Sequence, residues 1–168
     1  MKNNNKKQHI QVFFEGQNDL IYILGTAMAS ICYNTESFID FYILDCGIHS
    51  FNKKQINLLK EKFNNCSITF IDIDLKQFIG LPGWGYCGIV RDINSPHYHI
   101  DCYARLLIPE LVPELDKVIY LDTDIIALDD IKKLYDEDLE GYELGAVCDI
   151  GCNNFYQTNF VNNLGVNK

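Results

Sequence analysis

The chain has 168 residues, of which 48% are hydrophobic, so it can bury the core of one ordinary domain and is too apolar to be disordered. Its 14 Lys and Arg stand against 23 Asp and Glu, and the net charge of −9 argues against nucleic acid as a partner. No apolar run approaches the roughly 20 residues that cross a bilayer, and the first residues lack a secretory signal. We therefore expect a single domain over residues 1–168, located in the cytoplasm, without a transmembrane segment.

Short hydrophobic runs alternate with helical patterns along the chain. Runs of β-branched and aromatic residues predict strands at 10–15, 39–45, 67–72 and 117–122. Apolar residues at helical spacing predict helices at 19–33, 50–63 and 99–107. Strands that are apolar almost throughout and that alternate with helices indicate an α/β fold, with a mainly parallel, Rossmann-like sheet flanked by helices.

Residues 80–96 interrupt the alternation. They hold four glycines, two prolines and Trp84, which predicts a loop that could act as a lid. The letters at 83–88 spell G-x-G-x-x-G, but no strand precedes them and no helix follows, so they are not read as a dinucleotide fingerprint. His97 and His99 lack the partner spacing of a zinc site. The seven cysteines form no C-x-x-C pair, which favours free thiols.

Three of the predicted strands end in a carboxylate or run into one. These residues are Glu15, Asp45 and Asp122. In parallel α/β sheets, ligands bind at the carboxyl ends of the strands. We therefore expect the chemistry of the protein at this acidic edge.

The sharpest local motif is Asp122-Thr123-Asp124, which directly follows an apolar run. Two carboxylates suit a hard cation such as Mg²⁺ or Mn²⁺, and a metal held by Asp122 and Asp124 would keep positions open for the phosphate oxygens of a nucleotide. The same letters also fit a polar turn at the end of a buried strand, because Asp is common in turns.

Two classes of enzyme use a hydrophobic strand that ends in D-x-D. In the haloacid-dehalogenase type of phosphatase the first Asp is a nucleophile, and the motif carries Thr or Val two residues after the second Asp, near the start of the chain. Here that position is Ile126 and the motif lies late in the sequence. The phosphatase interpretation is therefore the weaker one.

The other class is the metal-dependent glycosyltransferases. Four segments carry the likeness: I-L-D-C-G-I at 43–48, C-Y-A-R-L at 102–106, L-D-K-V-I-Y-L-D-T-D at 115–124 and L-G-A-V-C-D at 144–149. From residue 10 onward the chain resembles glycosyltransferase family 8, which includes bacterial lipopolysaccharide galactosyl- and glucosyltransferases and the glycogenins. The resemblance implies a GT-A type fold, a UDP-sugar donor, Mn²⁺ (or Mg²⁺), and transfer with retention of configuration to a glycan or lipid-linked sugar acceptor.

The resemblance also implies roles for single residues. Asp122 and Asp124 match the metal-binding pair, with Thr123 between them against the donor. Arg105 matches the arginine that faces the sugar and diphosphate of the donor, and Tyr103 precedes it in the same motif, separated from it by Ala104. Asp149 matches an acidic residue beside the sugar pocket. Taken without the family, Arg105 could equally be a surface or ion-pair arginine.

The chain departs from the family pattern after the first strand. Gln17 and Leu20 stand where the family has an Asp and a Tyr for the uracil ring. Asn18 and Asp19 can still offer hydrogen bonds to a base or ribose, whereas a leucine cannot stack as an aromatic ring does.

The family pattern continues past the region of residues 159–168 into acceptor-site residues and a distal histidine of the metal shell. We therefore expect the acceptor part, and any association with a membrane surface through it, to lie beyond Lys168. This leaves open a non-catalytic, truncated sugar-nucleotide-binding remnant.

Overall fold

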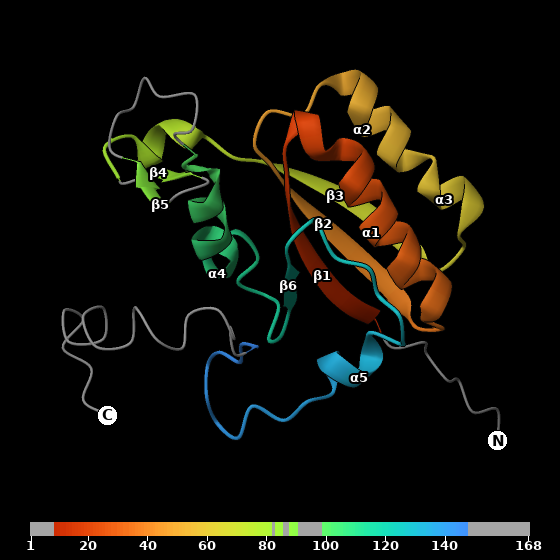
Figure 1. Cartoon of the computed structure of the whole chain (residues 1–168). Coiled ribbons are helices and arrows are strands. Elements are labelled where there is room, and N and C mark those ends of the chain that lie inside the picture. The colour runs from red at the N-terminus through yellow and green to blue at the C-terminus, as the bar shows by residue number, and fades with distance from the viewer. Residues whose placement is uncertain (1–8, 82, 86–87, 91–98, 148–168) are drawn as a thin grey trace, which may run out of the picture. The chain divides into compact units, whose positions relative to one another are not determined.

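The computed structural model describes residues 9–81, 83–85, 88–90 and 99–147, with the backbone alone for 83–85 and 88–90. The chain divides into two compact units, residues 1–136 and 137–168, and every helix and strand described lies in the first (Figure 1). In chain order these elements are β1 (His9–Gly16), η1 (Asn18–Leu20), α1 (Ile21–Asn34), β2 (Phe38–Asp45), α2 (Ser50–Asn57), α3 (Leu59–Lys62), β3 (Cys66–Asp72), η2 (Leu75–Phe78), β4 (Gly83–Gly85), β5 (Gly88–Val90), η3 (Asp101–Leu107), α4 (Ile108–Leu111), β6 (Ile119–Leu121) and α5 (Lys132–Tyr135).

The main sheet has four strands in the order β3-β2-β1-β6, and all three pairings are parallel. This confirms the predicted α/β fold with a mainly parallel sheet. The chain runs outward from β1 to β2 and β3, and then returns to place β6 on the other side of β1. The strand order therefore reverses between β1 and β6. Open α/β sheets bind their ligands in the crevice at the carboxyl ends of two strands between which the order reverses.

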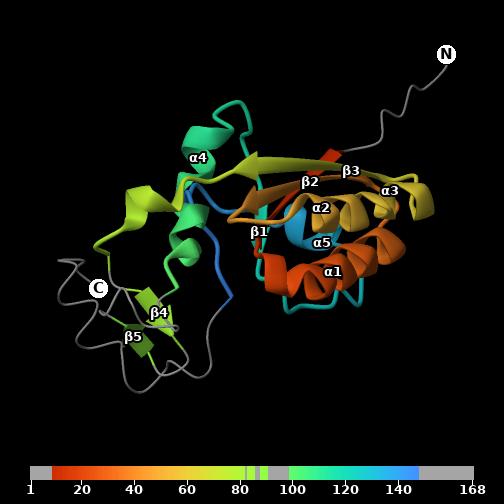
Figure 2. The same ribbon diagram turned by 90° about the horizontal axis from the view of Figure 1, so that it is seen from above.

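Strand β1 is buried on both of its faces. Val12 and Phe14 pack in a core with α1 and α2, whereas Phe13 packs in a second core with Ala104 of η3 and Ile108 of α4. Successive side chains of a strand point to opposite faces, so one strand can serve both cores. Figure 2 shows α1, α2 and α3 on one side of the sheet and α4 on the other. The sheet is therefore covered by helices on both faces, as its apolar strands predict.

The prediction of a loop over residues 80–96 is wrong for two short segments. Strands β4 and β5 form an antiparallel pair in which Trp84 is opposite Ile89. Three-residue strands among glycines carry too few side chains to show a period of two, so the sequence pattern could not reveal them. Residues 82, 86–87 and 91–96 lie outside the described part of the chain.

Two predicted helices differ in detail. The helix expected at 50–63 is α2 followed by α3, with Leu58 between them. The pattern at 99–107 is a 3₁₀ helix, η3, which continues as α4 with Pro109 in its first turn. Proline is well suited to a first helical turn because its missing N–H would have no partner there. Strand β6 is also shorter than the predicted 117–122.

Gly16 ends β1 in a tightly packed place. A Cβ built there would lie 2.5 Å from Cγ2 of Ile43 and 2.6 Å from Cδ1 of Ile48. Only a residue without a side chain lets the turns after β1 and β2 lie this close, and that closeness brings the two strand ends together at one edge.

Candidate functional site

Arg105 and Asp122 meet at the carboxyl end of β6. Nη2 of Arg105 lies 3.4 Å from Oδ1 of Asp122, whose side chain remains 62% exposed. The guanidinium carbon is 4.5 Å from the centroid of the Tyr120 ring, and Nε donates to the carbonyl of Cys102 at 2.9 Å. A fork of N–H donors held over an aromatic face is preorganised to grip a carboxylate or phosphate. The structure thus brings together the arginine and the first aspartate that the sequence singled out.

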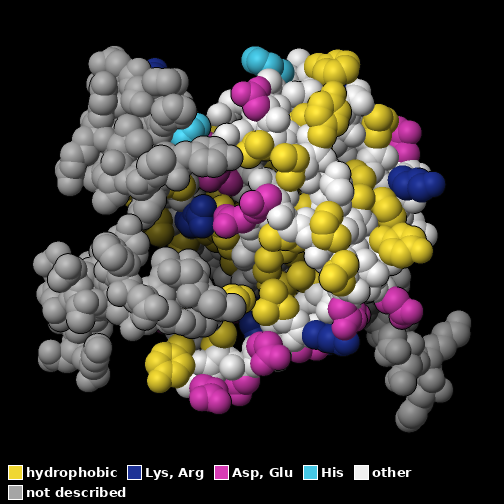
Figure 3. Space-filling model, viewed as in Figure 1, with side chains coloured by type: hydrophobic (Ala, Val, Ile, Leu, Met, Phe, Trp, Pro, Cys, Tyr) yellow, Lys and Arg dark blue, Asp and Glu magenta, His cyan; other side chains and the backbone are white. Residues whose placement is uncertain are grey.

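Asp124 has different surroundings from Asp122. With Ile23 and Thr26 of α1 and the two isoleucines that follow it, Asp124 lines a small hollow of about 290 Å³. On the face drawn in Figure 3, exposed hydrophobic side chains gather over α1 and the segment after β6; they include Ile23 and Ile126. Both aspartates are exposed, and Thr123 is the partly buried residue of the turn between them. The turn therefore presents two carboxylates to solvent on either side of one threonine.

A second group of acids, which the sequence reasoning did not identify as a group, lies beside Arg105. Nε2 of Gln17 donates to Oε1 of Glu15 at 2.8 Å and also to the carboxylate of Asp101 in η3. Asp101 is only 8% exposed. Burial raises the pKa of Glu15 to about 7; the hydrogen bond from Gln17 opposes the rise, and the nearby Asp101 adds to it. Glu15 is therefore partly protonated near neutral pH.

The same surroundings suppress ionisation of two neighbouring groups. Burial, together with Glu15 and Asp101, raises the pKa of the Cys46 thiol to about 12. Burial raises the pKa of Tyr120 as well, while Arg105 opposes the rise. Neither group is ionised at neutral pH, so neither serves as a nucleophile.

The residues predicted to hold the base and ribose are partly engaged by the protein itself. Oδ1 of Asn18 accepts hydrogen bonds from the His49 amide at 3.1 Å and from Nδ2 of Asn52 at 2.9 Å. Asp19 is exposed on η1, directly before α1. Leu20 is half-buried and accordingly offers no stacking ring. Asp19 is therefore the more open of the two polar side chains.

Tyr103 packs beside the ring of Phe78, with centroids 5.8 Å apart and planes at 36°. This contact joins η2 to η3, the helix that carries Arg105. Asp149, the last of the predicted site residues, lies outside the described part of the chain.

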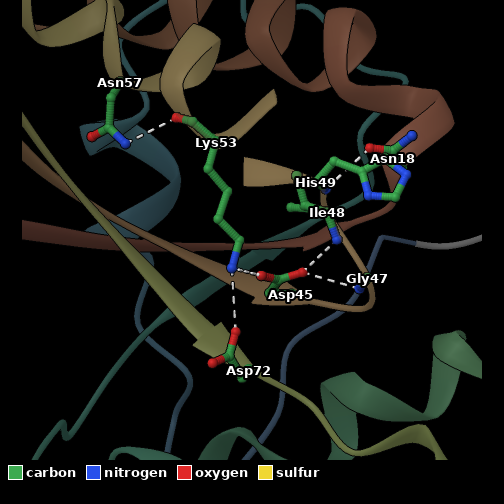
Figure 4. A network of polar contacts seen from close by, with 8 residues as sticks. All are labelled: Asn18, Asp45, Gly47, Ile48, His49, Lys53, Asn57 and Asp72. Carbon is green, nitrogen blue, oxygen red and sulfur yellow. Dashed lines mark hydrogen bonds and ion pairs between the residues drawn. The ribbon is translucent and has the colours of Figure 1, made fainter. Parts of the chain in front are cut away.

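The carboxyl end of β2 holds the third acid of the predicted edge, and its partners are internal (Figure 4). Oδ1 of Asp45 accepts from the amides of Gly47 at 3.0 Å and Ile48 at 2.7 Å. Its other oxygen pairs with Lys53, whose Nζ is also 3.3 Å from Oδ1 of Asp72. Burial alone would raise the pKa of Asp45, but these contacts outweigh it and hold the pKa below its usual value. Asp45 shapes the turn into α2 and is not open to a ligand.

An open cavity of about 1020 Å³ lies elsewhere, lined by residues that include Thr35, Ser37 and Asn65. These residues directly precede β2 and β3, so the cavity lies at the amino ends of the strands. We place no chemistry there, because ligands of parallel sheets bind at the opposite edge.

The side chains at the Asp122-Thr123-Asp124 turn are chemically suited to bind a divalent cation. Carboxylate oxygens are the ligands that Mg²⁺ and Mn²⁺ prefer, and both carboxylates are exposed. Within the described residues, no group of three or more His, Cys, Asp or Glu side chains is placed to hold a metal. A metal here would depend on Asp122 and Asp124 together with oxygens from a ligand. The helices of the described segments also include none that could cross a membrane.

Comparison with known proteins gives a consistent result. The family model described as Glycosyl transferase family 8 matches residues 11–167. General stress protein A of Bacillus subtilis is 30% identical over 132 residues, which cover 76% of this chain and 42% of that protein. Glycosyltransferase GlyF of Streptococcus pneumoniae serotype 4 is 30% identical over 141 residues, which cover 83% of this chain and 31% of that protein.

Among solved structures, galactosyltransferase LgtC in complex with donor and acceptor sugar analogs matches with a TM-score of 0.75 and 29% identity. The match covers 94% of this chain and 52% of LgtC. The fold is therefore of the GT-A type, as the resemblance implied. The chain spans about half the length of LgtC and less than half of the two relatives named above.

Proposed function

Since the chain belongs to glycosyl transferase family 8, we propose that it binds a UDP-sugar and transfers the sugar, with retention of configuration, to a glycan or lipid-linked acceptor. The observation that carries the proposal is the pairing of Arg105 with Asp122 at the point where the strand order reverses. A role in lipopolysaccharide or other surface-glycan synthesis, in the cytoplasm, is part of the proposal. The haloacid-dehalogenase alternative gives way to the family match.

In this proposal Arg105 binds the diphosphate. Its guanidinium is held over the Tyr120 ring and lies 3.4 Å from the exposed Asp122, so an entering phosphate can take up the donors on its open side. Asp122 and Asp124 would hold Mn²⁺ or Mg²⁺, which when bound neutralises the charge that develops on the departing nucleoside diphosphate. Arg105 stabilises that same charge electrostatically.

The remaining predicted residues complete the donor site. Gln17, Asn18 and Asp19 lie between the end of β1 and the start of α1, where a base or ribose would rest. In sequence, Tyr103 shortly precedes Arg105, and Thr123 lies between the two aspartates. Asp149 is assigned to the sugar itself, on the family resemblance alone. Its contacts would set which sugar is accepted.

A second candidate function is binding of a sugar nucleotide without transfer. The small number of metal ligands favours this function. The described residues supply two candidate carboxylates, whereas Mg²⁺ and similar cations take six or more oxygen ligands, so the metal that transfer requires would be held weakly. Binding and turnover therefore need separate measurements.

Calorimetric titration of UDP into the full chain, with and without Mn²⁺, tests binding. We expect heat that requires Mn²⁺, and a loss of affinity of about 100-fold or more in Asp122→Ala and in Asp124→Ala. Asp129→Ala is a matched control, because Asp129 is similarly exposed, at 69%, and pairs with Lys133 as Asp122 pairs with Arg105. Absence of Mn²⁺-dependent heat, or equal behaviour of all three variants, would contradict both candidates.

A UDP-release assay with a UDP-sugar donor then separates the two candidates. Release that depends on Asp122 supports transfer. Binding without release, over a panel of donors and sugar acceptors, supports the second candidate.

A further inference from the structure

We propose that Asp101 is a positioning residue for nucleotide-sugar binding. Through Gln17 it ties the start of η3 to the end of β1, and so it sets where Arg105, at the other end of η3, lies relative to Asp122. The inference rests on the proposed function, because it concerns the affinity of the same site for a donor.

The link between η3 and β1 is built from partly buried polar contacts. Gln17 and Asp101 are 84 residues apart in sequence, and Asp101 is 8% exposed. The side-chain amide of Gln17 has two N–H donors. One meets Asp101 and the other meets Glu15 at 2.8 Å. Both donors are used, so the amide is fixed in one orientation between the strand and the helix.

The helix carries this constraint to Arg105. Asp101 lies in the first turn of η3 and Arg105 in its last turn. Nε of Arg105 donates to the carbonyl of Cys102 on the same helix, so the guanidinium moves with η3. Its outer contacts, the Tyr120 ring and Asp122, belong to β6 and to the turn after it. The helix thus spans from β1 to β6, with Asp101 at one end and Arg105 at the other.

Packing contributes to the placement of η3 as well. Ala104 is fully buried against Phe13 and Leu44 of the sheet. Such apolar contacts permit small shifts along the helix axis, whereas a hydrogen bond fixes direction and distance. Loss of the Asp101 contact should therefore leave η3 folded and misplace Arg105.

The closing experiment measures the affinity of the full chain for UDP-glucose in Mg²⁺ by calorimetry. The proteins compared are the wild type, Asp101→Ala, Asp101→Asn, Arg105→Ala and the double variant Asp101→Ala/Arg105→Ala. We expect Asp101→Ala to bind about tenfold more weakly. Asp101→Asn keeps an oxygen that accepts from Gln17 and should stay within about twofold of the wild type. The double variant should bind no more weakly than Arg105→Ala alone.

The coupling between the two positions is the decisive readout, because a merely structural residue would weaken binding equally in both backgrounds. The same tenfold loss in the Arg105→Ala background would overturn the proposal, as would an equal loss in Asp101→Asn and Asp101→Ala. If Asp101→Ala fails to fold, Gln17→Leu removes the contact from the β1 side and is expected to show the same coupling with Arg105→Ala. If Gln17→Leu shows no such coupling, the proposal fails.

These outcomes differ from a failure of the proposed function. If the wild type binds neither UDP nor UDP-glucose with Mg²⁺ or Mn²⁺, the proposed function falls and this inference falls with it. If the wild type binds and the coupling is absent, this inference alone is wrong.

Discussion

The carboxyl ends of β2 and β6 each carry an aspartate, and the two are used in opposite ways. Asp45 is 5% exposed, and its oxygens are occupied by two backbone amides and Lys53. Asp122 is 62% exposed and lies 3.4 Å from an arginine that is itself partly open. An acid at the end of a strand can therefore bind a ligand only where the protein has left its carboxylate oxygens accessible.

The largest effect should follow from Asp45→Ala. It leaves the Lys53 amine and the amides of Gly47 and Ile48 without their acceptor, so we expect the free energy of unfolding to fall by about 3–5 kcal/mol. Urea denaturation followed by circular dichroism measures the loss. A cost below about 1 kcal/mol would show that Asp45 is as dispensable to the fold as a surface acid.

A smaller effect is the pH dependence of stability, which has opposite signs for Glu15 at the end of β1 and Asp45 at the end of β2. Burial raises the pKa of Glu15 to about 7, whereas the contacts of Asp45 lower its pKa. Because the folded protein holds the Glu15 proton more tightly than the unfolded chain, Glu15 contributes its full stabilisation at pH values below its ordinary pKa of 4.5. This contribution is lost as the pH rises through about 7. Asp45 has the opposite sign, and its contribution is lost in acid, as the pH falls below 3.8.

We therefore expect the wild type to lose about 1 kcal/mol between pH 5 and 8 relative to Glu15→Gln, after allowance for the partial exposure of Glu15. Thermal and urea unfolding of both proteins at each pH measure the difference. Parallel stability curves for the two proteins over this range would contradict the raised pKa of Glu15.

The smallest effect on stability should come from Asp122→Ala. Because Asp122 is exposed and its ion pair with Arg105 is long, we expect a change of no more than about 0.5 kcal/mol in the same urea experiment. Asp129→Ala, at another exposed ion pair, should leave the urea midpoint unchanged. A loss comparable to that of Asp45→Ala would make Asp122 a structural residue, and the contrast between β2 and β6 would vanish.

Much of the sheet could be predicted from the sequence, because its strands are long apolar runs and its acids stand at their ends. The alternation at 10–15, 39–45 and 67–72 gave β1, β2 and β3 to within two residues. Which acid serves the fold could not be predicted. That distinction depends on the turn after β2, where Gly47 has a φ of 109° and brings its amide back to Asp45.

The part of the candidate site that was missed is the buried acid. The meeting of Arg105 with Asp122 follows the motif spacing, but Asp101 acquires its role from Gln17, 84 residues away. No local pattern records such a contact. The single available signal was that Asp101 shares a helical segment with Arg105, in a place where a solvent-facing acid was equally plausible.

The place of β1 in the sheet also governs the order in which the chain can fold during synthesis. Phe14 pairs with Ile43 on one side and with Leu121 on the other. One edge of β1 therefore has no strand to pair with until the ribosome has released the residues of β6. An unpaired edge on an apolar strand invites association between nascent chains, so slow translation before Ile119 should raise aggregation and the demand for chaperones.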